Sequence, residues 1–373
     1  MKQKLFIVVN IDRFFLSHRK EIGIAADKIY NVTIVAKDTG KRKEIESLGL
    51  KFIDLPLDRS GMNPLKEFKT FFFLYELYRN EKPDLVHHVG LKVILWGSLA
   101  AKLATVKAEV NAISGLGVFF SEDNKSLIGK LLPKVLRFSH NKRRLSCIFQ
   151  NDEDKKLFLS NKIIQLNQVD FIKGSGVNLS VFNYTPEPDS EKVNILFTAR
   201  MLKEKGVLIL AQAAQKIKSK YANHVEFWLC GGIDDNPTAL KAEDLKALCD
   251  GDYFQWLGYR TDVLELLKKS HIVAFPSYYK EGLPKSLIEA TAIGRPIITT
   301  DSIGCRETVE DGKNGYLIPI KDSEQLAEKL SVLIENKDLR IKMGQESRKL
   351  AVKYFSLDTV IEQHLAIYKK LLK

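Results

Sequence analysis

Two acidic residues, Glu281 and Glu289, flank seven residues in the stretch Phe275–Glu289, which reads FPSYYKEGLPKSLIE. The apolar run at its start predicts a buried strand, and the pattern from Pro284 onward predicts a helix. Glu281 would then lie in the loop facing the helix start, and Glu289 one to two turns inside the helix. Free backbone N–H groups at a helix start suit an anionic or hydroxyl-rich ligand, and Gly282 lets the backbone approach it closely. The stretch therefore predicts a site for a polar ligand.

Two cations follow a different predicted strand, in the stretch Thr198–Gly206, which reads TARMLKEKG. Arg200 and Lys205 would lie at the mouth of a strand–loop–helix unit. Cations at such a position can neutralise a diphosphate as its bond to a sugar breaks. Two basic residues in a loop would by themselves be solvated surface. With the acidic pair later in the chain they form a constellation suited to a sugar diphosphate.

The spacing of these residues resembles the signature of the retaining, nucleotide-sugar-dependent glycosyltransferases of family 4, which have the GT-B fold. The acidic pair matches the E-x7-E motif, and Arg200 with Lys205 matches the R-x4-K pyrophosphate clamp. The resemblance implies that Glu281 contacts the donor sugar and that Glu289 holds the ribose hydroxyls. Glu281, Arg200 and Lys205 would be the catalytic residues.

Further donor contacts are implied by the same resemblance. Gly282 and Leu283 follow the first acid of the motif, and Arg260 lies in a loop that holds the nucleobase in this family. Ser114 stands after a strand, at the position where many members of the family carry a histidine that contacts the donor sugar. The glycines after Ser114 do not form a dinucleotide-binding fingerprint, because Phe120 occupies the place of the third glycine.

Candidate acceptor-binding residues follow the strands predicted in the first half of the chain, because ligands bind beyond the carboxyl ends of parallel strands. The segment around His18 and Arg19 resembles one found in enzymes of capsule, O-antigen and glycan-precursor assembly. His18 is equally well explained as a histidine satisfied at a helix start. The acceptor candidates are Asn10, His18, Arg19, His87 and Lys92.

The elements that must position these residues form two α/β domains. A chain of 373 residues is longer than the chains that usually fold around a single hydrophobic core. In the first half, apolar runs alternate with helical segments, a rhythm that predicts parallel sheets covered by helices. These runs are Leu5–Val9, Val32–Ala36, Phe52–Leu55, Leu85–His88, Val110–Ile113 and Cys147–Phe149.

The polar, proline-containing segment 185–191 predicts a linker between the domains. We expect an acceptor-binding Rossmann-like domain over residues 1–184 and a nucleotide-sugar-binding one over 192–355. The resemblance to GT-B proteins implies that the domains face each other across a cleft. It also implies that the last helix, about 356–373, crosses back onto the first domain.

The formal net charge of +12 falls mostly in residues 1–192. A basic half suggests a polyanionic partner, which is a nucleic acid, an anionic bilayer or a phosphate-bearing substrate. Segment Lys125–Arg144 has seven basic residues, no acidic one and a helical apolar pattern interrupted by Pro133. It suits the anionic inner face of a plasma membrane, or it is a solvated helix packed on the sheet. No apolar run is long enough for a membrane span or a signal peptide, so we expect a cytoplasmic, peripherally bound protein.

No cofactor and no metal are expected. The acids Asp152, Glu153 and Asp154 resemble a D-x-D metal motif, but Asn151 followed by acids is better explained as a helix N-cap and first turn. Four cysteines lie far apart without C-x-x-C spacing, which favours reduced thiols.

The expected function is transfer of a hexose or N-acetylhexosamine from a nucleotide-diphospho-sugar to an acceptor. The resemblance implies a UDP-sugar donor and an undecaprenyl-diphosphate-linked saccharide acceptor in bacterial surface polysaccharide synthesis, with no nucleic acid partner. A nucleotide-sugar epimerase on the same fold is an alternative that needs no acceptor. A basic nucleic-acid-binding protein is another, but it gives Glu281 and Glu289 no role.

Overall fold

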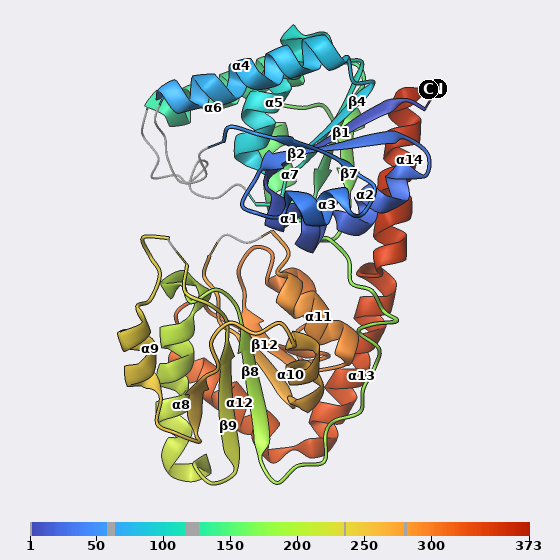
Figure 1. Ribbon diagram of the computed structural model, residues 1–373. Helices are drawn as coiled ribbons and strands as arrows, with labels where there is room; N and C mark the ends of the chain where they lie inside the picture. Colours follow the sequence, from blue (N-terminus) through green and yellow to red (C-terminus); the bar gives the residue numbers. More distant parts are fainter. Residues whose placement is uncertain (1, 58–63, 116–126, 235, 280–281) are drawn as a thin grey trace. The chain divides into compact units, whose positions relative to one another are not determined.

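The computed structural model describes residues 2–57, 64–115, 127–234, 236–279 and 282–373. It divides into two units, one formed by Met1–Ser175 with Asp358–Lys373 and the other by Gly176–Leu357. Each unit has a parallel sheet with helices packed against it (Figure 1). The α/β class and the parallel sheets predicted from the sequence are therefore confirmed.

The first unit contains a seven-stranded sheet in the order β3-β2-β1-β4-β5-β6-β7, with every pair parallel. The five inner strands of this sheet are largely buried on both faces, as is usual for parallel sheets, whereas the edge strands β3 and β7 are partly exposed. On β1, Leu5, Ile7 and Val9 pack on one side, while Phe6 and Val8 pack on the other. The strands are β1 (Lys4–Ile11), β2 (Asn31–Lys37), β3 (Lys51–Asp54), β4 (Leu85–Val89), β5 (Ala108–Ala112), β6 (Leu145–Phe149) and β7 (Val169–Phe171).

Helices cover both faces of this sheet. One face packs mainly against α4 and α5, and the other packs against α1, α2 and the last helix of the chain. Asn151 caps α7 by accepting a hydrogen bond from the Asp154 N–H at 2.7 Å, so the predicted N-cap is confirmed. The helices are α1 (Asp12–His18), α2 (Lys20–Asp27), α3 (Arg42–Glu46), α4 (Pro64–Glu81), α5 (Leu91–Leu103), α6 (Leu127–His140), α7 (Asp152–Ser160) and α14 (Leu357–Leu372).

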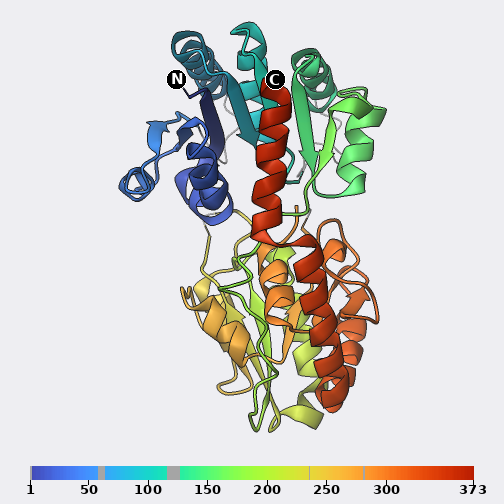
Figure 2. The ribbon, with the colours of Figure 1, turned by 90° about the vertical axis from the view of Figure 1, so that its right-hand side faces the viewer.

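The last helix, α14, packs on the first unit although it follows the whole of the second in the sequence (Figure 2). Val360, Ile367, Tyr368 and Leu371 lie on its buried side, in one core with the odd-numbered residues of β1. The apolar side of this amphipathic helix is thus buried against the first sheet.

The second unit contains a six-stranded parallel sheet in the order β10-β9-β8-β11-β12-β13. In both sheets the order reverses direction beside the first strand, between β1 and β4 in one and between β8 and β11 in the other. Such a switch point opens a crevice beyond the strand ends, where ligands bind in open α/β sheets. The strands are β8 (Val193–Thr198), β9 (Val225–Cys230), β10 (Phe254–Trp256), β11 (Ile272–Phe275), β12 (Ile297–Thr300) and β13 (Gly315–Ile318).

The helices of the second unit pack in pairs on the sheet, with α8 against α12 and α11 against α13. Short 3-10 turns, η2 (Lys203–Lys205) and η3 (Arg306–Thr308), follow β8 and β12. The helices are α8 (Val207–Tyr221), α9 (Ala242–Leu248), α10 (Val263–Lys269), α11 (Lys285–Ile293), α12 (Ser323–Glu335) and α13 (Lys337–Tyr354).

The two units divide at Ser175/Gly176, ten residues before the linker expected at 185–191. Val177 explains the difference, because its side chain is buried in a core with Ile288 and Phe355 of the second unit. Its backbone N–H also donates to the Phe355 carbonyl at 2.8 Å. The chain therefore joins the second unit before it reaches the polar segment.

Segment 185–191 is held in place by two buried arginines. Arg295 donates to the Thr185 carbonyl at 2.7 Å and to the Pro186 carbonyl at 3.3 Å, and burial lowers its pKa to about 10. Arg340 forms a two-pronged ion pair with Glu187 at 2.8 and 2.7 Å. Side-chain exposure is only 6% for Arg340 and 8% for Glu187.

Replacing Glu187 with glutamine is expected to lower the free energy of unfolding by about 3 kcal/mol, because removing one partner leaves the other charge buried and uncompensated. Urea unfolding followed by tryptophan fluorescence measures this loss. Glu191→Gln, at an exposed position in the same segment, is the matched control and should change stability by less than about 0.5 kcal/mol. Equal midpoints for the two variants would contradict the anchoring role of Glu187.

Among the described residues, no helix combines the length and the apolar character that crossing a membrane requires. All four cysteines are free, and Cys147, Cys230 and Cys305 are buried.

Candidate active site

The loop with the two predicted cations, Arg200 and Lys205, follows β8, and the predicted acidic stretch follows β11. These two strands are neighbours at the switch point of the second sheet. β8 and β11 pair in parallel, with Ile195 opposite Ile272. The carbonyl of Glu204, between the two predicted cations, accepts hydrogen bonds from the N–H groups of Tyr278 and Tyr279 at 2.9 and 3.1 Å. The two loops are therefore joined directly at the carboxyl edge of the sheet.

Lys205 lies inside this junction, with only 9% of its surface exposed. Its Nζ is 5.6 Å from the centre of the Phe275 ring and 5.2 Å from that of Tyr279. A lysine ammonium over an aromatic face is attracted by the negative potential of the ring. Lys205 thus presents a fixed positive charge beside the segment that leads to the acidic motif.

Gly206 permits the close approach of the two loops. Its φ of +87° lies in the left-handed region, and a Cβ on this residue would be 2.1 Å from the carbonyl oxygen of Pro276. A larger residue would have to displace the backbone that follows β11.

Arg200 follows β8 directly, and its side chain is 41% exposed. Its Nη1 donates to Oδ2 of Asp234 at 2.7 Å. Asp234 belongs to the loop after β9 and was missed in the sequence. Asp234 could have been found from the sequence, because it lies in the acidic run GGIDDN just after a predicted strand, and ligand-binding residues often lie at such strand ends.

Glu281 lies outside the described residues, so its predicted position stays a prediction. Gly282 is partly buried at the edge of the described segment. The side chain of Leu283 is buried in a core with Ile288 and Ala292, which leaves its backbone as the part that a donor can contact.

Glu289 lies in the second turn of α11, which begins at Lys285 after the cap residue Pro284. Its side chain is 14% exposed and is 3.6 Å from Nζ of Lys285. Burial raises its pKa above the usual 4.5, and the nearby Lys285 opposes this effect. Glu289 is thus a shielded carboxylate on the helix that follows the β11 loop.

Arg260 is exposed in the loop after β10. It forms a two-pronged ion pair with Asp262 at 2.7 and 2.5 Å, which lowers the pKa of Asp262 to about 2. The β9 and β10 loops are joined by a hydrogen bond of 2.8 Å from the Gly231 N–H to the Gly258 carbonyl. The loops after four neighbouring strands therefore share the edge at which Arg200, Lys205 and Arg260 lie.

In the first unit, Asn10 lies near the carboxyl end of β1, at the switch-point edge, and His18 is the last residue of α1, the helix that follows this strand. Oδ1 of Asn10 accepts from the Ile11 N–H at 2.9 Å. His18 stacks on Phe14 with ring centres 4.4 Å apart, and its Nδ1 is 2.7 Å from the Ser17 hydroxyl. The histidine is thus satisfied at the C-terminal end of α1, whereas the alternative explanation expected it at a helix start, and it remains partly exposed.

Arg19 and His87 do not lie on the surface that an acceptor can reach, and the sequence prediction is corrected here. His87 is fully buried, and its Nδ1 is 2.7 Å from the Tyr368 hydroxyl on α14. Arg19 is 3% exposed, and burial lowers its pKa to about 10. Both side chains point to the face of the sheet that α14 covers.

Lys92 and Ser114 follow β4 and β5 as predicted. Nζ of Lys92, in the first turn of α5, is 2.6 Å from Oε1 of Glu67 on α4, so an acceptor would have to compete with this ion pair. Ser114 is partly buried two residues after the end of β5. The segment from 116 to 126 that follows it lies outside the described residues.

Of the residues that the structure describes, no three His, Cys, Asp or Glu side chains are grouped so that they could hold a metal ion. The charged groups gathered at the β8–β11 edge are instead two cations with aromatic and carboxylate partners. Such an edge can bind the phosphates of a nucleotide and stabilise negative charge that develops on them.

Comparison with protein families gives two matches that together span most of the chain. Residues 185–350 match the family described as glycosyl transferases group 1, and residues 4–151 match the family described as glycosyl transferase 4-like.

Curated relatives are similar over nearly the full length. A Campylobacter jejuni N,N'-diacetylbacillosaminyl-diphospho-undecaprenol alpha-1,3-N-acetylgalactosaminyltransferase is 29% identical over 366 residues, covering 93% of each chain. An Escherichia coli UDP-Gal:alpha-D-GlcNAc-diphosphoundecaprenol alpha-1,3-galactosyltransferase is 24% identical over 359 residues, covering 94% of this chain and 91% of the relative.

Solved structures share the fold. A glycosyltransferase from Rickettsia africae superposes with a TM-score of 0.76 at 22% identity, over 100% of this chain and 99% of the other. The Anabaena protein HepE in complex with UDP superposes with a TM-score of 0.77 at 17% identity, over 99% and 100%. These neighbours have the GT-B fold, with two Rossmann-like domains, and this chain has the same fold.

Proposed function

Since the chain belongs to the group 1, family 4-like glycosyltransferases, we propose that it transfers a hexose or N-acetylhexosamine from a UDP-sugar to a saccharide linked to undecaprenyl diphosphate. The names of the Campylobacter and Escherichia relatives support the acceptor, and UDP bound to HepE supports the donor. The product would serve bacterial surface polysaccharide synthesis, as in a capsule or O-antigen. The enzyme would act at the inner face of the plasma membrane as a peripheral protein.

One observation carries the proposal: the loop with Lys205 and the loop that leads to the acidic motif are hydrogen bonded to each other at the switch point of the second sheet. These hydrogen bonds join the turn that contains a nearly buried cation to the segment that precedes the acidic motif in the sequence, and Glu289 of that motif lies on α11. A sugar diphosphate needs positive charge for its phosphates and carboxylates for its hydroxyls, and this edge provides both.

In the proposed reaction, the bond between the anomeric carbon and the β-phosphate oxygen breaks, and UDP leaves with an added negative charge. Arg200 and Lys205 stabilise that charge without a metal or other cofactor. The acceptor hydroxyl attacks from the face that UDP leaves, so the anomeric configuration is retained. Its proton passes to the departing phosphate. Glu281 orients the sugar hydroxyls, and Glu289 accepts hydrogen bonds from the ribose hydroxyls.

A transfer assay tests this function. Purified protein is first screened by thermal shift against UDP-, GDP- and ADP-sugars, because a bound ligand raises apparent stability by mass action. The stabilising donor is then incubated with a synthetic polyprenyl-diphosphate saccharide, and the products are identified by mass spectrometry. A glycosylated lipid acceptor is the expected product. A new sugar nucleotide formed without any acceptor would show an epimerase instead.

Glu289 makes donor binding depend on pH. The ionised carboxylate accepts the ribose hydroxyls, and its pKa is raised by burial. Donor affinity is therefore present above that raised pKa and is lost as the pH falls through it. The loss begins at a higher pH than for an ordinary glutamate with a pKa of 4.5.

The measurement is KM for the UDP-sugar between about pH 5 and pH 8, across which ordinary exposed glutamates stay ionised. Glu289→Gln should raise KM about tenfold at neutral pH, the cost of one charge-assisted hydrogen bond, and should flatten the pH dependence. An unchanged pH profile in this variant would assign the titration to another group.

A further inference from the structure

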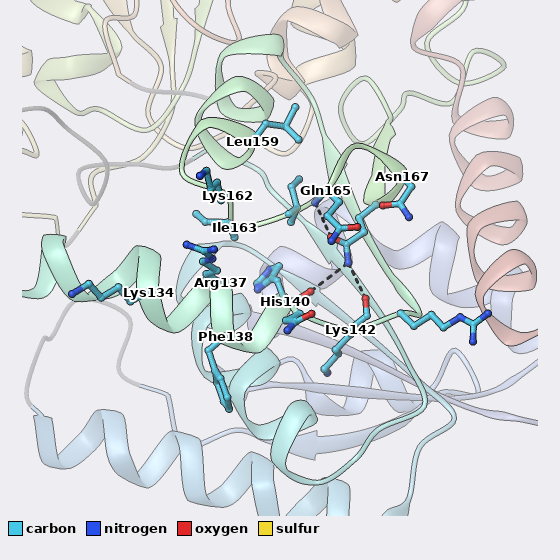
Figure 3. Close-up of a pocket in the computed structure, with 14 residues that line it drawn as sticks. Lys134, Arg137, Phe138, His140, Lys142, Leu159, Lys162, Ile163, Gln165 and Asn167 are labelled. Atoms are coloured by element: carbon cyan, nitrogen blue, oxygen red, sulfur yellow. Dashed lines mark hydrogen bonds between the residues drawn. The ribbon is translucent and has the colours of Figure 1, made fainter.

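The first unit contains a basic pocket that the proposed transfer reaction does not use (Figure 3). Its volume is about 870 Å3. The end of α6, the turn at 141–143 and the segment from 159 to 168 form its walls. These segments lead into the first residues of β6 and β7, so the pocket lies at the amino edge of the sheet. Asn10 and Ser114 lie at the opposite, carboxyl edge, and the pocket is therefore a separate site.

Four cations on the pocket wall have no acidic partner within the described part of the chain. They are Lys134, Arg137, Arg143 and Lys162, and all four are exposed. The residues that line the pocket include no aspartate or glutamate. Like charges gathered around a concavity raise its positive potential, so the pocket attracts an anion.

The walls of the pocket are fixed to the core of the unit. Gln168 is 7% exposed, and its amide donates to the carbonyls of His140 and Lys142 at 3.3 and 2.9 Å. The Lys142 ammonium pairs with Glu109, whose side chain is fully buried. This pairing removes Lys142 from the available charges and anchors the turn between α6 and β6. The four remaining cations thus extend from a rigid frame.

Exposed apolar side chains lie beside these charges. Leu131 and Phe138 on α6 are 59% and 55% exposed, and Leu166 is 74% exposed. Leu131, Lys134 and Phe138 are spaced i, i+3 and i+7, so they share one face of the helix. Phe138 itself lines the pocket. A free anion gives these apolar side chains no partner, whereas an anion attached to acyl chains does.

We propose that this pocket binds the phosphate-bearing head group of an anionic phospholipid, with Phe138 in contact with the apolar boundary of the bilayer. The inference rests on the proposed action at a membrane and names the place on the protein that makes the contact. Leu132 and Leu136 pack α6 into the core of the unit, as one explanation of the basic segment expected. The proposal adds a membrane contact for the exposed face of the same helix, which combines cations with apolar side chains.

Vesicle flotation of the full-length protein tests the proposal. The pocket variant combines Lys134→Gln, Arg137→Gln, Arg143→Gln and Lys162→Gln. The control variant removes the same number of charges at exposed positions away from the pocket, and combines Lys28→Gln, Lys43→Gln, Lys337→Gln and Lys342→Gln. The pocket variant is expected to bind vesicles containing phosphatidylglycerol at least about tenfold more weakly than the control. Wild-type protein should bind phosphatidylcholine vesicles poorly.

Equal losses in the two variants would overturn the proposal, because diffuse net charge would then explain the binding. A third variant, Phe138→Ser, should weaken vesicle binding without changing the thermal shift that inorganic pyrophosphate produces. If Phe138→Ser binds vesicles normally while the pocket variant loses the response to pyrophosphate, the site takes a free anion and the lipid assignment is wrong.

Transfer to a detergent-solubilised acceptor separates this proposal from the proposed function. The pocket variant should keep that activity, since its four positions belong to the first unit and lie at the edge of its sheet opposite Asn10 and Ser114. Wild-type protein that binds vesicles but transfers no sugar would refute the proposed function and leave the lipid site standing.

Discussion

Replacing Lys205 with alanine is expected to lower kcat by about 100-fold or more, the usual effect of losing one group that stabilises transition-state charge. The ammonium is nearly buried, between the rings of Phe275 and Tyr279, where water screens it poorly. The leaving diphosphate carries more negative charge in the transition state than in the bound donor, so kcat should fall more than KM rises. Steady-state kinetics with the donor and acceptor identified above measure both constants.

Lys203→Ala is the matched control, because Lys203 lies two residues earlier in the same 3-10 turn and is exposed. This variant should keep kcat within about twofold of the wild type, since an exposed charge contributes little. Melting temperatures of the two variants show whether both remain folded. If folded Lys205→Ala turned over at the wild-type rate, Lys205 would have no part in stabilising the leaving group.

The sequence predicted the second unit well because its signals are local. The end of a buried strand, a cation pair and a glycine lie within nine residues at Thr198–Gly206, and the acidic stretch Phe275–Glu289 is also continuous in the sequence. The rhythm of strands and helices then places both after strands of one sheet. The direct contact between the two loops, made through the Glu204 carbonyl, could not be predicted from the sequence. It depends on β8 and β11 being neighbours in the sheet, and the sequence does not show the strand order.

The errors of the sequence prediction came from contacts between residues that are distant in the sequence. His87 and Arg19 looked available because they follow or belong to strand ends, yet α14 covers them. Tyr368, which contacts His87, is 281 residues away. The polar segment at 185–191 looked like a free linker for the same reason, because Arg340, which pairs with Glu187, is 153 residues away. The residues near a position in the sequence indicate whether that segment is polar. Whether a side chain is buried depends on the distant residues that pack against it, such as Tyr368 and Arg340 here.

Gly206 is the second position at which a single substitution should have a large effect. Gly206→Ala is expected to lower the free energy of unfolding by about 3 kcal/mol and kcat by about 100-fold. The φ of +87° is strained for alanine, and the new Cβ would lie 2.1 Å from the Pro276 carbonyl oxygen. Relieving this clash must separate the Lys205 turn from the end of β11, and a shift of about 1 Å at a catalytic group can cost about 100-fold.

Gly251→Ala separates the two causes. Gly251 has a similar φ of +79°, but a Cβ there would meet no atom within 4 Å. The control should therefore lose only the roughly 1 kcal/mol of backbone strain and keep its kcat. Urea unfolding and steady-state kinetics of both variants give the comparison. If both lose the same stability and Gly206→Ala keeps its kcat, backbone strain alone explains the effect. The contact between the two loops would then not be what positions Lys205.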